Sequence, residues 1–576
     1  MVVGLLVLVP WFAFAVPAPE DALVGLWGSE QVLGPQVRGE LTLIRREGTW
    51  RARIAGFDVP VRVEGQKVDF LLPGGQGALR GSLSEDGRRV TGHWLQPRVN
   101  MSGMKFATPV SLSALQPGVW RGAVAPLEDR FSLYLVVRKR QDGAVEAFVR
   151  NPERNFGNRL VFRVGLQEGV VRLTPVSGNV RLEGTYDAES GRLSLLVPAL
   201  DRVFDFTRRE RDQAVGLYAR TPAPGPYVYQ APIAEDDGWK TASLGEVGMK
   251  VEPVRQLVQR ILDQEPGPES APAIQGLLVA RHGKLVVEEY FQGFDKERPH
   301  DLRSMAKSYA SVLIGIALER GAPFTVDTPV VSLFPEYEGK LQNLDARKRA
   351  LTVAHLMSMS TGLACDDDDP ASPGNEDRLD DSVPDWYRHT LDLPMVGAPG
   401  KKGVYCSANI NLLGGVLRNT TRTWIPEFFH QHLAVPLQLR DYHVDLMPDG
   451  EQYLGGGIYM RPRDALKLGQ LYLSKGTWNG RRVVGARWVE RSTANQSTMS
   501  DGRTYGYAWW RHELRVGDRV YSQYEGSGNG GQLVMVVPEL DLVVMFTAAN
   551  YNHVAIWRKF REELLPRYIL AAVEPD

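Results

Sequence analysis

The chain has 576 residues, enough for three or four domains of about 150 residues, and its 43% hydrophobic and 23% charged residues exclude a disordered, collagen-like or coiled-coil protein. Its 67 Lys and Arg residues nearly balance its 68 Asp and Glu residues, and the net charge of −1 provides no basic field, so we expect no nucleic-acid partner. With two cysteines, the chain is neither a disulfide-rich scaffold nor a protein with a zinc site made of cysteines alone.

The first predicted element is a signal peptide. Residues 1–16 form an uncharged apolar run interrupted by Pro10, and residues 13–15 (AFA) have the small-x-small pattern that signal peptidase recognises. We therefore expect a signal peptide over residues 1–19 and an exported protein, periplasmic or extracellular. An N-terminal membrane anchor is the alternative, although a spanning helix needs about 20 apolar residues and this run ends at Pro17.

Residues 25–209 predict an all-β region, because short runs alternate apolar and polar residues between turn sequences. Two pairs of segments in it resemble each other: 25–28 (GLWG) with 118–122 (GVWRG), and 79–83 (LRGSL) with 182–186 (LEGTY). They predict a duplication into two accessory units, each a small barrel or sandwich, at residues 20–112 and 113–215. Chance repetition of turn sequences is the alternative. We expect the active site to form without this region.

The sequence pattern changes after a Pro-rich stretch, residues 221–232, which marks a linker that we place at 216–250. From residue 251 to the end, helical periodicity alternates with strands, and this predicts an α+β domain over residues 251–576. The expected elements are helices at 254–262, 304–320, 352–357, 407–418, 462–473 and 555–565, a hairpin at 275–291, and strands at 532–537 and 540–546.

The strongest chemical signal is the pair Ser304 and Lys307 at the start of the longest predicted helix. Residues three apart share a helix face, so the amine should lie beside the hydroxyl. A lysine in a desolvated pocket can accept the proton of a serine and turn it into a nucleophile. The same S-x-x-K spacing recurs at residues 102–105 within the β region, so the spacing alone is weak. Only the first copy opens a predicted helix.

Two later segments supply the parts that such a nucleophile lacks. Residues 405–407 (YCS) precede an apolar helix, and residues 526–532 (GSGNGGQ) form a Gly-rich turn that leads into a strand. A tyrosine can shuttle a proton, and backbone N–H groups at a strand edge can stabilise an oxyanion. The order of these segments predicts a serine hydrolase.

With these motifs in this order, residues 251–570 resemble the serine β-lactamase-related superfamily, which includes class C β-lactamases, DD-peptidases, esterases and 6-aminohexanoate-dimer hydrolases. Flanking segments share the resemblance: 355–363, 370–376 and 505–510. The resemblance implies a β-lactamase/transpeptidase-like fold, an antiparallel sheet with a helical cluster. It also implies the site residues: Ser304 as the acylated nucleophile, Lys307 as its base, Tyr405 as the acid for the leaving group, and Ser407, Gly528 and Asn529 as oxyanion and substrate-binding residues.

The sequence departs from the family pattern at two motifs. Ser407 stands where the family usually has the Asn of Tyr-x-Asn, and residues 525–528 (EGSG) replace Lys-Thr-Gly or His-x-Gly. In lactamases that cation helps to hold the carboxylate of the drug, so the resemblance is closest to the esterase and 6-aminohexanoate-dimer hydrolase branch. A DD-peptidase or β-lactamase is the alternative. An inactive binding protein is the alternative from another class.

Three other features of the sequence, an acidic run, the cysteine pair and a tryptophan pair, each allow two interpretations. Residues 366–369 (DDDD) are either a site for a hard cation or a solvated loop at the cleft rim, and we expect the loop. Cys365 and Cys406 form either a disulfide or two buried thiols. Trp509 and Trp510 either line an acyl pocket or belong to the core.

The expected partners follow from the predicted chemistry. We expect a small-molecule or peptide-like ester or amide substrate, no metal and no organic cofactor. The β region is expected to contact a cell wall or another polymer. The natural substrate and the oligomeric state are left open.

Overall fold

The computed structural model describes residues 18–98, 103–156, 160–222, 225–268 and 271–574. Residues 1–17, most of the expected signal peptide, and Ser102 of the second S-x-x-K segment lie outside the described residues. Among the described residues, no helix combines the length and the apolarity needed to cross a bilayer.

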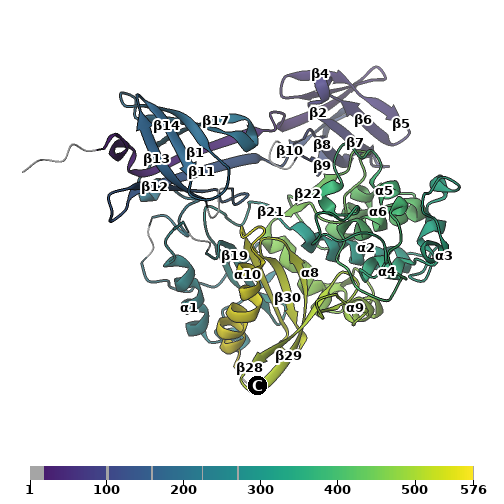
Figure 1. Ribbon diagram of the computed structural model, residues 1–576. Coiled ribbons are helices and arrows are strands. Elements are labelled where there is room, and N and C mark those ends of the chain that lie inside the picture. The colour runs from purple at the N-terminus through teal and green to yellow at the C-terminus, as the bar shows by residue number, and fades with distance from the viewer. Residues whose placement is uncertain (1–17, 99–102, 157–159, 223–224, 269–270, 575–576) are drawn as a thin grey trace, which may run out of the picture.

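The N-terminal third of the chain consists of a closed barrel and an open sheet (Figure 1). An α+β part follows, which begins with strand β18 at Lys240 and is called the catalytic part after its predicted function. In order around the barrel, its strands are β1 (Gly25–Gly34), β11 (Asp129–Lys139), β12 (Val145–Arg150), β13 (Val161–Gln167), β14 (Val170–Pro175), β15 (Leu182–Asp187), β16 (Arg192–Val197) and β17 (Arg202–Arg208). Large apolar side chains such as Trp27, Phe131 and Phe204 fill its interior. The expected α+β fold class with an all-β N-terminal region is confirmed.

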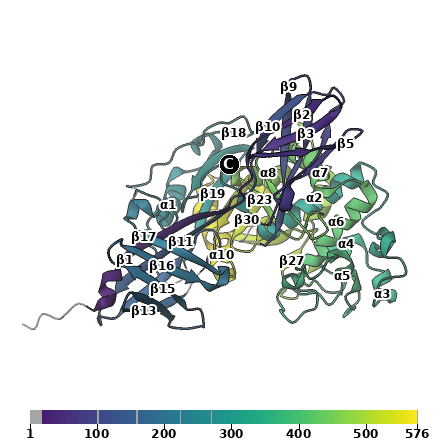
Figure 2. The ribbon, with the colours of Figure 1, turned by 90° about the horizontal axis from the view of Figure 1, so that it is seen from above.

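The open sheet has a core of its own, built around Leu41, Trp94 and Leu112. In order, its strands are β4 (Phe57–Pro60), β3 (Thr49–Ile54), β2 (Gly39–Arg46), β10 (Val119–Val124), β9 (Lys105–Gln116), β8 (Arg89–Gln96), β7 (Ala78–Leu83), β6 (Lys67–Leu71) and β5 (Arg62–Glu64). Lys105 of the second S-x-x-K segment therefore begins a strand and not a helix. Figure 2 shows this sheet apart from the barrel.

The two β units exchange their first strands, which the expected division at residues 112 and 113 did not foresee. β1 lies between β11 and β17 of the second unit, and β10 lies between β2 and β9 of the first. Each exchanged strand covers edges whose backbone groups would otherwise be unpaired. The repeated Trp27 and Trp120 occupy these equivalent strands, β1 and β10. The other repeated pair lies on β7 and β15. The duplication itself stays a prediction.

The catalytic part is built on a nine-stranded sheet. In order, its strands are β18 (Lys240–Thr241), β20 (Lys284–Tyr290), β19 (Ile274–Arg281), β31 (Leu542–Ala548), β30 (Gln532–Val537), β29 (Arg519–Gly528), β28 (Trp510–Val516), β27 (Thr504–Tyr505) and β26 (Ser497–Thr498). Further short strands are β21 (His300–Asp301), β22 (His443–Leu446), β23 (Ile458–Met460), β24 (Thr477–Trp478) and β25 (Arg481–Arg482). β22 pairs with β9, so the open sheet continues into the catalytic part.

Helices cover both faces of this sheet. One face carries α1 (Val251–Leu262) and α10 (Val554–Lys559) with its π-helical continuation Phe560–Ile569. The other face carries α2 (Ala306–Glu319), α8 (Pro462–Leu473) and the helical cluster of α3 (Ala346–Arg349), α4 (Val353–Met357), α5 (Trp386–Asp392), α6 (Ser407–Thr421), α7 (Ile425–Phe429) and α9 (Ala486–Thr493). Each helix expected from periodicity is present, with ends shifted by a few residues.

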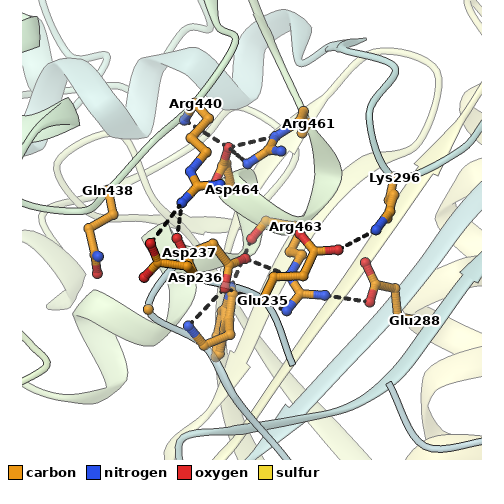
Figure 3. A network of polar contacts seen from close by, with 12 residues as sticks. Glu235, Asp236, Asp237, Glu288, Lys296, Gln438, Arg440, Arg461, Arg463 and Asp464 are labelled. Atoms are coloured by element: carbon orange, nitrogen blue, oxygen red, sulfur yellow. Dashed lines mark hydrogen bonds and ion pairs between the residues drawn. The ribbon is translucent and has the colours of Figure 1, made fainter. Parts of the chain in front are cut away.

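The expected linker is packed into the catalytic part. Its strand β18 extends the nine-stranded sheet, and the indole N–H of Trp239 donates to the Arg463 carbonyl at 3.0 Å. The guanidinium of Arg463 bonds Asp237 at 2.5 Å and Glu288 at 2.7 Å, in a network that Figure 3 shows. Arg463 and Asp237 are both buried. This segment is therefore a structural strap, because buried charges need their partners in place.

Candidate active site

Ser304 lies on a single 3-10 turn, Arg303–Met305, which leads directly into α2. Arg303 has a φ of +49°, a left-handed conformation that is rare for residues other than glycine and that recurs at functional sites. Asp301 braces Arg303: one carboxylate oxygen accepts its backbone N–H at 3.0 Å, and the other lies 3.0 Å from its Nε. The half-buried Ser304 is thus presented by a constrained turn.

Lys307 lies one turn further along and is fully buried, with 0% exposure. Its Nζ lies 2.8 Å from Ser304 Oγ, 2.8 Å from Ser407 Oγ and 2.5 Å from the Gly455 carbonyl oxygen. The three-residue spacing therefore brings the amine to the hydroxyl. These three contacts surround the nitrogen and fix its position.

Tyr405 approaches the same hydroxyl from the segment before α6. Its hydroxyl is close enough to Ser304 for that residue to lower its pKa, and its ring centroid lies 5.1 Å from Lys307 Nζ. The ring stacks on Trp510 with centroids 5.6 Å apart and planes 15° apart. Burial raises the pKa of Tyr405, against the opposing effects of Lys307 and Ser304. Tyr405 therefore carries its proton at neutral pH and can donate it.

Ser407 was expected to be an oxyanion or substrate-binding residue, but its side chain contacts other protein side chains. It is fully buried at the start of α6, and its side chain lies between Lys307 and a carboxylate from a distant loop. The backbone N–H and the hydroxyl of Ser407 both donate to Asp367 Oδ2 at 2.7 Å. Asp367 belongs to the acidic run 366–369 that was expected to be a solvated loop, so for this residue the interpretation was wrong.

A disulfide brings the loop of Asp367 to the site, so the two cysteines are bonded to each other and are not buried thiols. Cys365 and Cys406 are bonded, with their Cα atoms 5.6 Å apart. Cys365 is two residues before Asp367, and Cys406 stands between Tyr405 and Ser407. The bridge therefore joins the two chain segments that supply these side chains.

The environment of Asp367 is acidic and largely buried. Burial and the nearby Glu376 raise the pKa of Asp367 to about 6, although Lys307 and the bonds from Ser407 act in the opposite direction. Glu376 donates its backbone N–H to Asp367 Oδ1 at 3.1 Å, and its carboxylate accepts the hydroxyl of Tyr453. Carboxylates thus line the side of the site behind Lys307 and Ser407.

The Gly-rich turn at the end of β29 passes close to the turn that carries Ser304, Arg303–Met305. A Cβ atom on Gly528 would lie 2.2 Å from the Leu302 carbonyl oxygen, so this position requires glycine. Asn529 is held by its side chain, which donates to Asn552 Oδ1 at 2.7 Å and accepts the Asn552 backbone N–H at 2.8 Å. This places the strand edge beside Ser304. The oxyanion role of Asn529 stays a prediction.

Glu525, in the segment that replaces the family's third motif, is paired within the protein. Its Oε1 lies 2.7 Å from Arg561 Nη1 and 3.3 Å from His512 Nε2. Although burial alone would raise it, Arg561 and His512 hold the pKa of Glu525 at about 2. Glu525 is therefore an ionised structural residue at neutral pH.

Two arginines near the site are paired with carboxylates. Arg303 contacts Asp301, as described above. Arg503 lies 4.1 Å from the Trp510 ring centroid and pairs with Asp501 at 2.6 Å. Trp510 thus packs between Tyr405 and an arginine at the rim.

Trp509 and Trp510 are both buried, at 0% and 8% exposure, and both belong to the same core cluster. Of the two interpretations, the core therefore applies to both. Among the described residues, no group of three or more His, Cys, Asp or Glu side chains is arranged to hold a metal ion.

Comparisons with known proteins identify relatives of the catalytic part. The family model described as Beta-lactamase matches residues 254–555, more than half of the chain. The 6-aminohexanoate-dimer hydrolase of Paenarthrobacter ureafaciens is 26% identical over 372 residues, which cover 58% of this chain and 91% of that protein. Among solved structures, a family VIII carboxylesterase matches with a TM-score of 0.44 and 16% identity, covering 56% of this chain and 96% of that one. A D-stereospecific amidohydrolase from Streptomyces sp. matches with a TM-score of 0.39 and 16% identity, covering 50% and 94%.

Proposed function

The chain belongs to the Beta-lactamase family and is a serine hydrolase, and on this premise we propose that it cleaves an ester or amide bond through an acyl-enzyme on Ser304. The observation that carries the proposal is the contact of 2.8 Å between Lys307 Nζ and Ser304 Oγ, with the Tyr405 ring 5.1 Å from the same Lys307 nitrogen. A nucleophile within hydrogen-bond distance of a buried base has the geometry of covalent catalysis.

The reaction proceeds in two halves. Lys307 takes the proton of Ser304 as Oγ forms a bond to the substrate carbonyl carbon, and the resulting oxyanion lies near the backbone N–H groups of Ser304 and Asn529. The bond to the leaving group then breaks as Tyr405 gives it a proton, and Lys307 passes the proton from Ser304 on to Tyr405, so both groups are restored. In the second half, Lys307 takes a proton from a water molecule as the water oxygen attacks the acyl carbon, and the bond to Ser304 Oγ breaks as that proton is given to Oγ, which releases the acid.

The substrate class follows from the charges around the site. A substrate carboxylate beside the nucleophile needs a positive partner, because a buried unpaired charge costs several kcal/mol. Glu525 stands in the segment where relatives place a cation, and Arg303 and Arg503 are each paired with an aspartate. This supports neutral esters or amides over β-lactams and D-amino-acid peptides.

We also propose that the protein is exported. The apolar run at residues 1–16 supports this, and so does the disulfide between Cys365 and Cys406, because disulfides persist in oxidising compartments. A contact between the β units and a cell wall or another polymer remains a proposal.

The experiment has two readouts on the full chain. A fluorophosphonate probe should label the peptide that contains Ser304, and the control variant Ser304→Ala should not be labelled. Short-chain p-nitrophenyl esters should give a higher kcat/KM than nitrocefin. Preference for nitrocefin would replace the esterase proposal with the lactamase alternative, and a wild-type protein that neither labels nor turns over an ester would indicate an inactive binding protein.

A further inference from the structure

We propose that Asp367 is a positioning residue of the proposed reaction: it fixes the direction of the hydrogen bonds around Lys307, so that the amine turns its lone pair toward Ser304. The proposal rests on the proposed function, since it concerns how Lys307 comes to act as a base.

The direction of the bonds is set at the carboxylate. An ionised aspartate only accepts hydrogen bonds, and Asp367 Oδ2 lies 2.7 Å from both the backbone nitrogen and the hydroxyl of Ser407. Its other oxygen, Oδ1, accepts the backbone N–H of Glu376 at 3.1 Å. All three neighbours donate, so the single hydrogen of the Ser407 hydroxyl points to Asp367.

This leaves the oxygen of Ser407 as an acceptor for Lys307. In the state in which it acts as a base, Lys307 is a neutral amine with two hydrogens and one lone pair. One hydrogen goes to Ser407 Oγ at 2.8 Å and the other to the Gly455 carbonyl at 2.5 Å. The lone pair then faces Ser304 Oγ, 2.8 Å away, and this is the direction that proton removal from Ser304 requires.

Without the carboxylate, the same atoms permit an unproductive arrangement. A serine hydroxyl rotates and can donate as readily as it accepts. If Ser407 donated to Lys307, it would occupy the lone pair and leave Ser304 without a base. Asp367 excludes this arrangement because a carboxylate that faces the Ser407 oxygen at 2.7 Å needs the hydrogen between them.

The loop around Asp367 is built to keep the carboxylate in place. The side chain of Asn375 is buried and donates to the carbonyls of Asp366, Asp367 and Asp369, each at 3.1 Å. The backbone N–H of Asp367 donates to the Tyr405 carbonyl at 2.9 Å. These bonds tie the loop directly to the segment that carries Tyr405 and Ser407.

The arrangement predicts a pH dependence. Burial and Glu376 raise the pKa of Asp367, whereas Lys307, while it carries its charge, and the bonds from Ser407 lower it, and the resulting pKa is about 6. The hydroxyls of Tyr405 and Tyr453 also face Asp367. The ionised form is the one that orients Ser407. Acylation should therefore lose rate as the pH falls through about 6 and the carboxylate is protonated.

The test compares wild type with Asp367→Asn, which keeps the shape of the side chain but removes the charge and one acceptor. We expect kcat on a p-nitrophenyl ester to fall at least about tenfold with little change in KM, because general-base assistance contributes roughly 10²–10⁴-fold and Lys307 is still present. The loss of rate near pH 6 should disappear from the profile of fluorophosphonate labelling. Asp368→Asn, an exposed neighbour in the same run, is the matched control and should behave as wild type.

If Asp367→Asn fails to fold, Ser407→Ala tests the same chain of hydrogen bonds without altering the loop. This variant should also lose the decrease in acylation rate near pH 6. A folded Asp367→Asn or Ser407→Ala variant with wild-type kcat and the wild-type pH profile would overturn the positioning role. If wild type is labelled at Ser304 in that experiment, the proposed function stands and only the role of Asp367 fails. If wild type is not labelled, the proposed function itself fails.

Discussion

The barrel reaches the nucleophile turn through one arginine, and removing its charge should slow acylation. Arg154 follows β12, and its Nη1 lies 3.1 Å from Asp301 Oδ2 while its other nitrogen contacts the hydroxyl of Tyr459. Asp301 in turn braces Arg303, the residue before Ser304. The change Arg154→Met keeps much of the side-chain volume and deletes the guanidinium.

The size of the effect follows from burial. The side chains of Arg154 and Asp301 are 18% and 8% exposed, and removing one partner of a buried pair typically costs about 3–5 kcal/mol. Asp301 retains Arg303 as a partner, so we expect a smaller cost of about 2 kcal/mol. If that cost falls on the active arrangement of the turn, the rate decreases about 30-fold, at about 1.4 kcal/mol for each factor of ten.

The assay is the rate of fluorophosphonate labelling of Ser304, together with kcat/KM on a short-chain ester. The matched control is Arg298→Met, which breaks the ion pair of 2.9 Å with Glu153 at the same junction but leaves Asp301 untouched. The control should label at nearly the wild-type rate. A folded Arg154→Met protein that labels as fast as wild type would refute the link between the barrel and the nucleophile.

Two further predictions concern the catalytic part. The double variant Cys365→Ala, Cys406→Ala should lower the free energy of unfolding by about 4 kcal/mol, because the bridge closes a loop with a sequence separation of 41. It should also lower ester turnover, because the bridge no longer holds Asp367 beside Ser407. A denaturant titration and a turnover assay check this, and an unchanged unfolding midpoint would contradict it. A chain that begins at Val251 keeps Glu288 but lacks Asp237, the fully buried partner of Arg463, so we expect it to be insoluble or to fail to label with the probe. A soluble, labelled product would instead agree with the sequence-based expectation that the active site forms without the N-terminal region.

The contact between Ser304 and Lys307, the proposed nucleophile and its base, could be predicted because it is local. Ser304 and Lys307 are three residues apart, and the start of a helix is enough to bring them together. Tyr405 was predicted from motif order and family resemblance. Asp367 was missed because its approach to Ser407 depends on a loop path and a disulfide, and neither leaves a pattern in the sequence around it.

The arrangement of the β units was only partly predictable, for a related reason. Alternating apolar residues identify a strand and its buried face, but they do not name the neighbouring strand. The pattern therefore found β1 and β10 as strands and assigned each to the wrong sheet. Likewise, the prolines of residues 221–232 indicated an extended segment, but they contained no information about Arg463, the residue that binds Asp237.

The exchange of β1 and β10 also sets the order in which the two β units can fold during synthesis. The open sheet cannot be completed until β10 has been made, and β1 must wait for β17, which ends at Arg208, before the barrel closes around it. Pairings between strands so distant in sequence form slowly, and an unpaired strand is a template for aggregation in the meantime. β1 pairs with β11 along its whole length, so it has no partner until β11 (Asp129–Lys139) has been made, and we expect the chain to be most prone to aggregation during that interval.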